Sequence, residues 1–169
     1  MRQIGEIVIY GSKGVCKIEE ICSLDMSGEM KEYYVLAPLY DKSTKVYVPI
    51  DKERLTNRMR DVMSPEAIEE FIADIDSIEA DWCEDTDERK PYYTDIVSKG
   101  DVRRIVAMLK ALYVHRAKLD KMNRRMYVSD ERSIRDGEKL IQGEIAHVFG
   151  LHPSEVAQFV EERRAARRN

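Results

Sequence analysis

The chain has 169 residues, a length that suits one compact domain or two small ones. Hydrophobic residues make up 43% and charged residues 36%, which is enough for a core and a strongly polar surface. The net charge of −4 argues against general polyanion binding. No apolar run approaches the roughly 18 residues of a membrane span, and the N-terminus lacks the apolar stretch of a signal peptide. Three scattered cysteines, Cys16, Cys22 and Cys83, argue against a disulfide framework and for a cytoplasmic location.

The first 58 residues predict β-structure. Runs of β-branched and aromatic residues alternate with turn-forming segments. We expect strands at 7–10, 15–21, 33–39 and 45–50, and turns at 11–14, 27–28 and 41–43. A sheet of four or five short strands can bury its apolar face only if the sheet curls on itself. We therefore predict a small barrel.

After residue 60 the apolar residues follow a helical period. Ser64 and Pro65 are typical of an N-cap and a first helical position, and Ile68, Phe71, Ile72 and Ile75 form the apolar stripe that follows. A second helix is expected over 88–98, with Pro91 in its first turn. Asp101 should cap a third that runs to about residue 121, and Ser129 or Asp130 should begin a fourth that ends at Gly150. A last helix is expected from 154–155, with 163–168 as a frayed, solvated tail.

These patterns predict an α+β protein. Residues 1–60 are expected to form the small β-barrel domain, and residues 61–169 an all-α domain of four or five helices. The junction between them should lie near 57–63.

Charge is segregated along the chain. Residues 1–60 carry a net charge of +1, residues 61–100 carry −10, and residues 101–169 carry +5. Such segregation indicates more than one surface and more than one kind of partner.

Catalytic and metal-binding patterns are missing from the sequence. The three histidines, His115, His147 and His152, are scattered, and no zinc, phosphate-loop or dinucleotide-binding motif is present. The carboxylates of 79–88 are typical of a solvated acidic loop. We therefore expect no enzyme, no cofactor, no metal and no small-molecule substrate.

The helix over 102–121 carries basic residues on the face opposite its apolar stripe. From Arg103 to Arg125 there are eight basic residues and one acid, Asp120. Such a stripe can meet phosphates and release their counterions, although it is also compatible with an ordinary solvated helix face.

Trp82 is the only tryptophan and lies among acidic residues just beyond the first helix. It could be an exposed wedge that stacks on or separates bases, or a side chain that covers the core between two helices. The neighbouring acids disfavour close approach to DNA. The barrel could recruit a protein through an edge strand and its tyrosines (Tyr33, Tyr34, Tyr40 and Tyr47), of which at least half are expected to fill the core.

Several motifs in this order resemble the CarD family of bacterial transcription regulators. The resemblance covers about residues 1–150. It rests on Ile4–Tyr10, Gly14-Val15, Ile18-Glu19, Lys31–Leu36, Val46–Pro49, Trp82 followed by Arg89, Ser98–Asp101, Glu138–Ile141 and Glu144–Ala146.

The resemblance implies an SH3-like or Tudor-like N-terminal domain that docks on the β subunit of RNA polymerase, a module shared with the transcription-repair coupling factor. It also implies a helical domain that contacts promoter DNA at the upstream edge of the transcription bubble, where a tryptophan wedge slows bubble collapse. The polymerase contact would be Lys45, Val46, Tyr47, Val48 and Pro49. The DNA contacts would be Trp82, Arg89, Arg103, Arg104, Lys110, Lys118, Lys121, Arg124 and Arg125.

Two other functions stay open at this point. One is a protein-interaction adaptor in which Trp82 is core and the basic helix packs on an acidic surface, such as the chain's own residues 61–100. The other is direct DNA binding without polymerase, which the net negative charge disfavours. The segment 150–169 is expected to be an appended helix.

Overall fold

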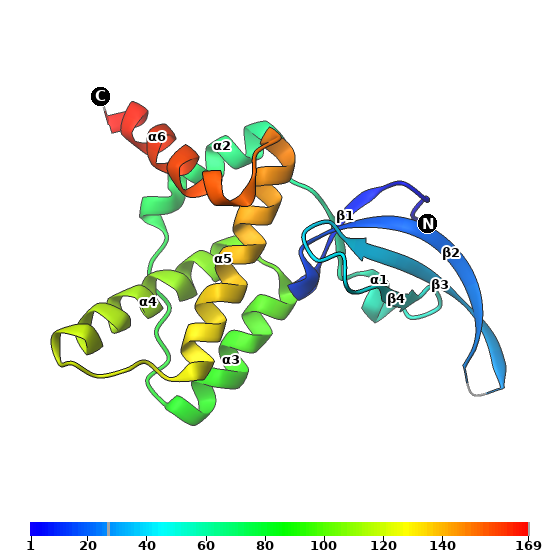
Figure 1. Cartoon of the computed structure of the whole chain (residues 1–169), viewed down its shortest axis with the longest axis horizontal. Helices are drawn as coiled ribbons and strands as arrows, with labels where there is room; N and C mark the ends of the chain where they lie inside the picture. Colours follow the sequence, from blue (N-terminus) through cyan, green and yellow to red (C-terminus); the bar gives the residue numbers. More distant parts are fainter. Residues whose placement is uncertain (27, 169) are drawn as a thin grey trace. The chain divides into compact units, whose positions relative to one another are not determined.

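The structure, a computed structural model, describes residues 1–26 and 28–168. It divides into two compact units, Met1–Val62 and Met63–Asn169, which Figure 1 shows as a β-sheet unit and a helical unit. The α+β class is therefore confirmed.

The N-terminal unit is a five-stranded antiparallel sheet. Its strands are β1 (Ile7–Tyr10), β2 (Val15–Met26), β3 (Glu29–Pro38), β4 (Val46–Pro49) and β5 (Met59–Asp61), in the spatial order β4-β3-β2-β1-β5. A 3-10 turn, η1 (Gly11–Lys13), joins β1 to β2, and a short helix, α1 (Glu53–Thr56), precedes β5. In the described residues no ladder joins β4 to β5, so the predicted barrel is not closed.

The sheet curves because its central hairpin is long and carries a bulge. The register of β2 and β3 shifts between Ile18 and Glu20, which bends the strands over the core. Figure 1 shows the curved β2–β3 hairpin. The expected turn at 27–28 lies partly outside the described residues, since Ser27 is not among them.

The core of this unit comes from alternate positions along each strand. It contains Val8, Cys16, Ile18, Tyr34, Leu36, Val48 and Met59. Of the four tyrosines, Tyr33 and Tyr34 are buried, whereas Tyr40 and Tyr47 are exposed. Half of the four tyrosines are therefore buried, and Tyr34 belongs to this core.

The second unit contains five α-helices in its described residues. They are α2 (Pro65–Asp74), α3 (Thr86–Lys99), α4 (Val102–Lys121), α5 (Val128–Phe149) and α6 (Val156–Arg168), with 3-10 turns η2 (Ile75–Ser77) and η3 (Pro153–Glu155). One apolar cluster joins α3, α4 and α5, and a second joins α2, α4, α5 and α6.

The predicted helix ends are mostly confirmed. Ser64 accepts a hydrogen bond from the amide of Ala67, and Asp101 caps α4. Gly100 and Gly150 end their helices in the left-handed conformation that favours glycine.

In the sheet, β2 runs to Met26 rather than to residue 21, and β3 begins at Glu29 rather than at residue 33. Three segments of the helical unit also differ from the prediction. The second helix begins at Thr86 rather than Glu88, because Asp85 accepts hydrogen bonds from two amides and serves as its N-cap. Pro91 consequently lies beyond the first turn. The next helix begins at Val128, one residue before the expected start. The end of the chain is helical to Arg168 rather than frayed, because its arginines pair with acidic residues of α2 and η2.

Candidate functional site

Trp82 lies in the irregular segment 79–85 that precedes α3, and its side chain is 36% exposed. Its indole packs against the imidazole of His115 from α4, with the ring centroids 4.5 Å apart and the ring planes tilted by 35°. The indole Nε1 donates a hydrogen bond of 2.6 Å to the carboxylate of Glu84. Trp82 therefore packs on the protein with part of its surface and presents the rest to solvent.

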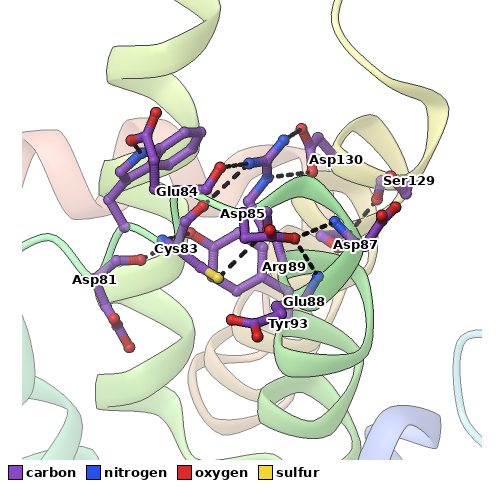
Figure 2. Close-up of polar contacts among 12 residues, drawn as sticks. Asp81, Cys83, Glu84, Asp85, Asp87, Glu88, Arg89, Tyr93, Ser129 and Asp130 are labelled. Carbon is purple, nitrogen blue, oxygen red and sulfur yellow. Dashed lines mark hydrogen bonds and ion pairs between the residues drawn. The ribbon is translucent and has the colours of Figure 1, made fainter.

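Arg89, one of the expected DNA contacts, is buried. Its Nε and Nη2 donate to the two carboxylate oxygens of Asp130 at 3.1 and 3.0 Å, as Figure 2 shows. Its Nη1 donates to the carbonyls of Cys83 and Glu84 at 3.0 and 3.2 Å. Burial acts to lower the pKa of Arg89, but the hydrogen bond and charge of Asp130 outweigh it and raise the pKa. The guanidinium edge is occupied within the protein and is not available to phosphates.

The backbone on both sides of the tryptophan is held by hydrogen bonds. The amide of Asp81 donates to the carbonyl of Ala107 at 3.0 Å. The hydroxyl of buried Tyr93 donates to the carbonyl of Asp81 at 2.8 Å and accepts from the amide of Cys83 at 3.3 Å. Burial raises the pKa of Tyr93 to about 12, so its hydroxyl stays a donor at neutral pH. The segment is irregular in form but fixed in place.

The first half of the basic face of α4 is engaged inside the helical unit. Arg103 pairs with Asp74 at the end of α2, and this contact lowers the pKa of Asp74. The ammonium of Lys110 donates to three backbone carbonyls that follow α2. Arg104 lies over the ring of Tyr92 and donates to its hydroxyl at 3.3 Å. These three predicted DNA contacts therefore hold helices together in this structure.

The second half of the basic face is exposed. Four predicted DNA contacts are exposed there, namely Lys118, Lys121, Arg124 and Arg125. Among the residues that the structure describes, none of these side chains forms an ion pair. A phosphate could approach them without displacing an internal partner.

An open groove of about 470 Å³ lies beside this second half, between α4 and α5. Its walls carry the arginines Arg116, Arg124, Arg125 and Arg135, together with the acids Asp120, Glu131 and Glu138. Arg116 and Arg135 are absent from the predicted set. On a helical projection Arg116 falls within the apolar stripe, between Ile105 and Leu109, rather than on the basic face. Arg135 reaches the groove because α5 packs on α4, which the sequence alone does not reveal.

The predicted polymerase-contact strand is an edge of the sheet. In the described part of the chain, β4 has β3 as its one neighbour. The amide of Ile50 donates to the carbonyl of Glu32 at 2.9 Å, so by strand alternation Val48 also faces β3 with its backbone groups. The N–H and C=O of Tyr47 then point to the open side of the strand.

The side chains of this segment alternate in the same way. Val48 is buried in the core, whereas Tyr47 is 49% exposed. Lys45, just before β4, pairs at 3.0 Å with Glu19, the residue at the β2 bulge, and this hydrogen bond raises the pKa of Lys45. The side chain of Tyr47 is therefore exposed, and its backbone N–H and C=O form no ladder bond to β3.

Comparison with known proteins gives a family match for the N-terminal unit. The family model described as the CarD-like/TRCF RID domain matches residues 3–63. The search of curated proteins found no match at the required significance. No helix in the described residues is both long and apolar enough to cross a membrane. Residues 3–63 are therefore similar to the CarD-like/TRCF RID domain, a family of RNA polymerase-interaction modules.

Proposed function

We propose that the chain regulates transcription by docking on the β subunit of RNA polymerase and contacting promoter DNA at the upstream edge of the bubble, where it changes the stability of the open complex. The observation that carries this proposal is the match of residues 3–63 to the CarD-like/TRCF RID domain, supported by the position of β4 at the edge of the described sheet.

The edge strand supports docking by strand addition. A partner strand can use the outward N–H and C=O of Tyr47, while the exposed tyrosine ring adds contact area. Pro49 lies two residues after Tyr47, so its backbone also faces away from β3. The missing N–H of this proline therefore removes no hydrogen bond to β3. The partner strand is therefore confined to a short segment of β4.

The helical unit is the proposed DNA-contacting part. Its exposed basic side chains at the end of α4 offer charge to phosphates, and Trp82, in the segment before α3, offers an aromatic surface. We assign the phosphate contacts to Lys118, Lys121, Arg124 and Arg125, and leave out the side chains that are engaged internally.

Tethering explains how an acidic chain acts on DNA. Docking on polymerase raises the local concentration of the helical unit at the promoter, so its own DNA affinity can stay weak. Unstacking a base step costs a few kcal/mol, and an inserted indole offsets part of this cost. The open complex is stabilised only by the difference in affinity between the open and closed forms.

A second candidate function is a protein-interaction adaptor. It is favoured by the pairing of Arg103 with Asp74 and of Arg164 with Asp76, because basic residues here bind acids of the chain's own 61–100 segment. The exposed side chains of Arg124 and Arg125 beside the α4–α5 groove are not explained by this function.

The test uses the full chain, purified core RNA polymerase and a promoter fragment. Capture of polymerase by the chain, together with a changed lifetime of competitor-challenged open complexes, is the expected result. Capture with no change in lifetime favours the adaptor. Absence of capture contradicts the docking role.

A further inference from the structure

The indole of Trp82 is held from more than one direction by side chains that belong to other elements. Besides His115 from α4, the guanidinium carbon of Arg89 lies 4.6 Å from the centre of the Trp82 ring. A cation over an indole face is attracted by the ring electrons, most strongly where water is excluded. Trp82 thus rests on a preformed support.

The support is anchored deep in the helical unit. Arg89 and Asp130 are 2% and 1% exposed, and their two-bond pairing joins α3 to the first turn of α5. A buried ion pair has little net effect on stability when compared with apolar packing, so stability alone does not explain it. What the pair does achieve is a fixed orientation of the guanidinium, with one side bonded to the Cys83 and Glu84 carbonyls and its central carbon near the indole.

We infer that Arg89, fixed by Asp130, and His115 are positioning residues that hold Trp82 in the orientation in which it meets DNA. This inference rests on the proposed function, since it assigns to Trp82 the DNA contact described there. A side chain fixed before binding loses less entropy when it inserts, which strengthens its effect on the open complex.

Substitution of Arg89 by lysine tests directly whether Arg89 fixes the orientation of Trp82. A lysine ammonium keeps the charge but lacks the planar set of donors that binds Asp130 and two carbonyls together. Arg89→Lys should therefore leave Trp82 mobile. Arg163→Lys is the matched control, because Arg163 lies 4.4 Å from the ring centre of Phe159 on α6, in the same kind of contact.

The readout is the fluorescence of Trp82, which is the single tryptophan of the chain. In Arg89→Lys and in His115→Ala we expect lower emission anisotropy and a quenching constant for acrylamide that rises by about twofold or more. Open-complex lifetime should fall toward that of Trp82→Ala. Polymerase capture and the far-ultraviolet circular dichroism spectrum should stay unchanged, and the Arg163→Lys control should match the wild type.

The possible results separate this inference from the function on which it rests. If folded Arg89→Lys and His115→Ala show the anisotropy and quenching of the wild type, the positioning role is wrong. If Arg89→Lys does not fold, the fluorescence of His115→Ala tests the positioning role. His115 is only half-buried, so we expect its substitution to leave the fold intact. If fluorescence changes but Trp82→Ala itself leaves the lifetime unchanged, the proposed DNA contact fails while the support of Trp82 stands.

Discussion

Arg103 on α4 is paired with Asp74 at the end of α2, and this contact divides a basic face that is continuous in the sequence. Toward the start of α4 the basic side chains are bound to neighbouring elements. Toward its end, from Lys118 onward, they are exposed. The two halves should therefore respond differently to mutation.

The double substitution Arg124→Gln/Arg125→Gln should weaken binding of the chain to the polymerase–promoter complex. The slope of the logarithm of the binding constant against the logarithm of the salt concentration should become shallower. The change should be about one for each phosphate that the variant no longer neutralises. Affinity measured over a range of potassium chloride concentrations tests this.

Arg103→Gln is the matched control. It removes one positive charge from the same face, but that charge is already paired, so the salt dependence should stay as in the wild type while the chain unfolds at a lower urea concentration. Equal effects of both variants on DNA binding would show that the division of the face has no functional meaning.

Tyr47→Pro should reduce polymerase affinity by about tenfold, because it removes one outward N–H from the edge strand. It removes no bond to β3, so the fold should be kept. Tyr47→Ala separates the backbone from the ring: it keeps the N–H and removes only side-chain contact. Competition binding to core polymerase measures both. Wild-type affinity in Tyr47→Pro would exclude strand addition at β4.

Glu84→Gln should strengthen the effect of the chain on the open complex by about twofold, because it removes a negative charge that repels phosphates near Trp82. The glutamine side-chain oxygen can still accept the hydrogen bond from the indole Nε1. Glu79→Gln, on the same segment but farther from the tryptophan in sequence, is the comparison variant. A lifetime that falls in Glu84→Gln would show that the carboxylate helps rather than hinders.

Asp76 should couple the stability of the helical unit to pH. Hydrogen bonds from Arg168 and Arg164 hold the pKa of Asp76 below its ordinary value. A carboxyl whose pKa is depressed on folding stabilises the fold above its unfolded pKa and loses that contribution as pH falls through the folded-state pKa. Wild type should exceed Asp76→Asn in unfolding free energy at neutral pH, and the difference should shrink below about pH 4.

Urea unfolding across this pH range measures the effect of Asp76. Glu70→Gln, on the exposed face of α2, should show no such pH-dependent difference, because in the described residues Glu70 has no ion-pair partner. A constant difference between wild type and Asp76→Asn at all pH values would rule out the ion pairs as its cause.

The elements that sequence predicts well are those with local signals. Ser64, Asp101 and Gly150 cap or end their helices through their own side chains or backbone freedom, so their positions can be read from the chain. Strand β5 carries no comparable signal: it has three residues, and it exists because β1 offers it an edge.

Long-range contacts account for the differences between the sequence predictions and the structure. Arg89 looks like a surface cation in the sequence, and only Asp130, 41 residues later, makes it an internal one. The arginines at the end of the chain resemble a solvated tail until α2 and η2 supply Glu69 and Asp76. A sequence shows which residues carry charge, but the partner of each charge is fixed by tertiary packing.

The lifetime of open promoter complexes formed with Trp82→Ala tests the central claim most directly. With the variant present at saturating concentration and polymerase capture at the wild-type level, we expect the lifetime to return to that of polymerase alone. A lifetime equal to that with the wild-type chain would contradict the claim that Trp82 contacts the promoter at the edge of the bubble.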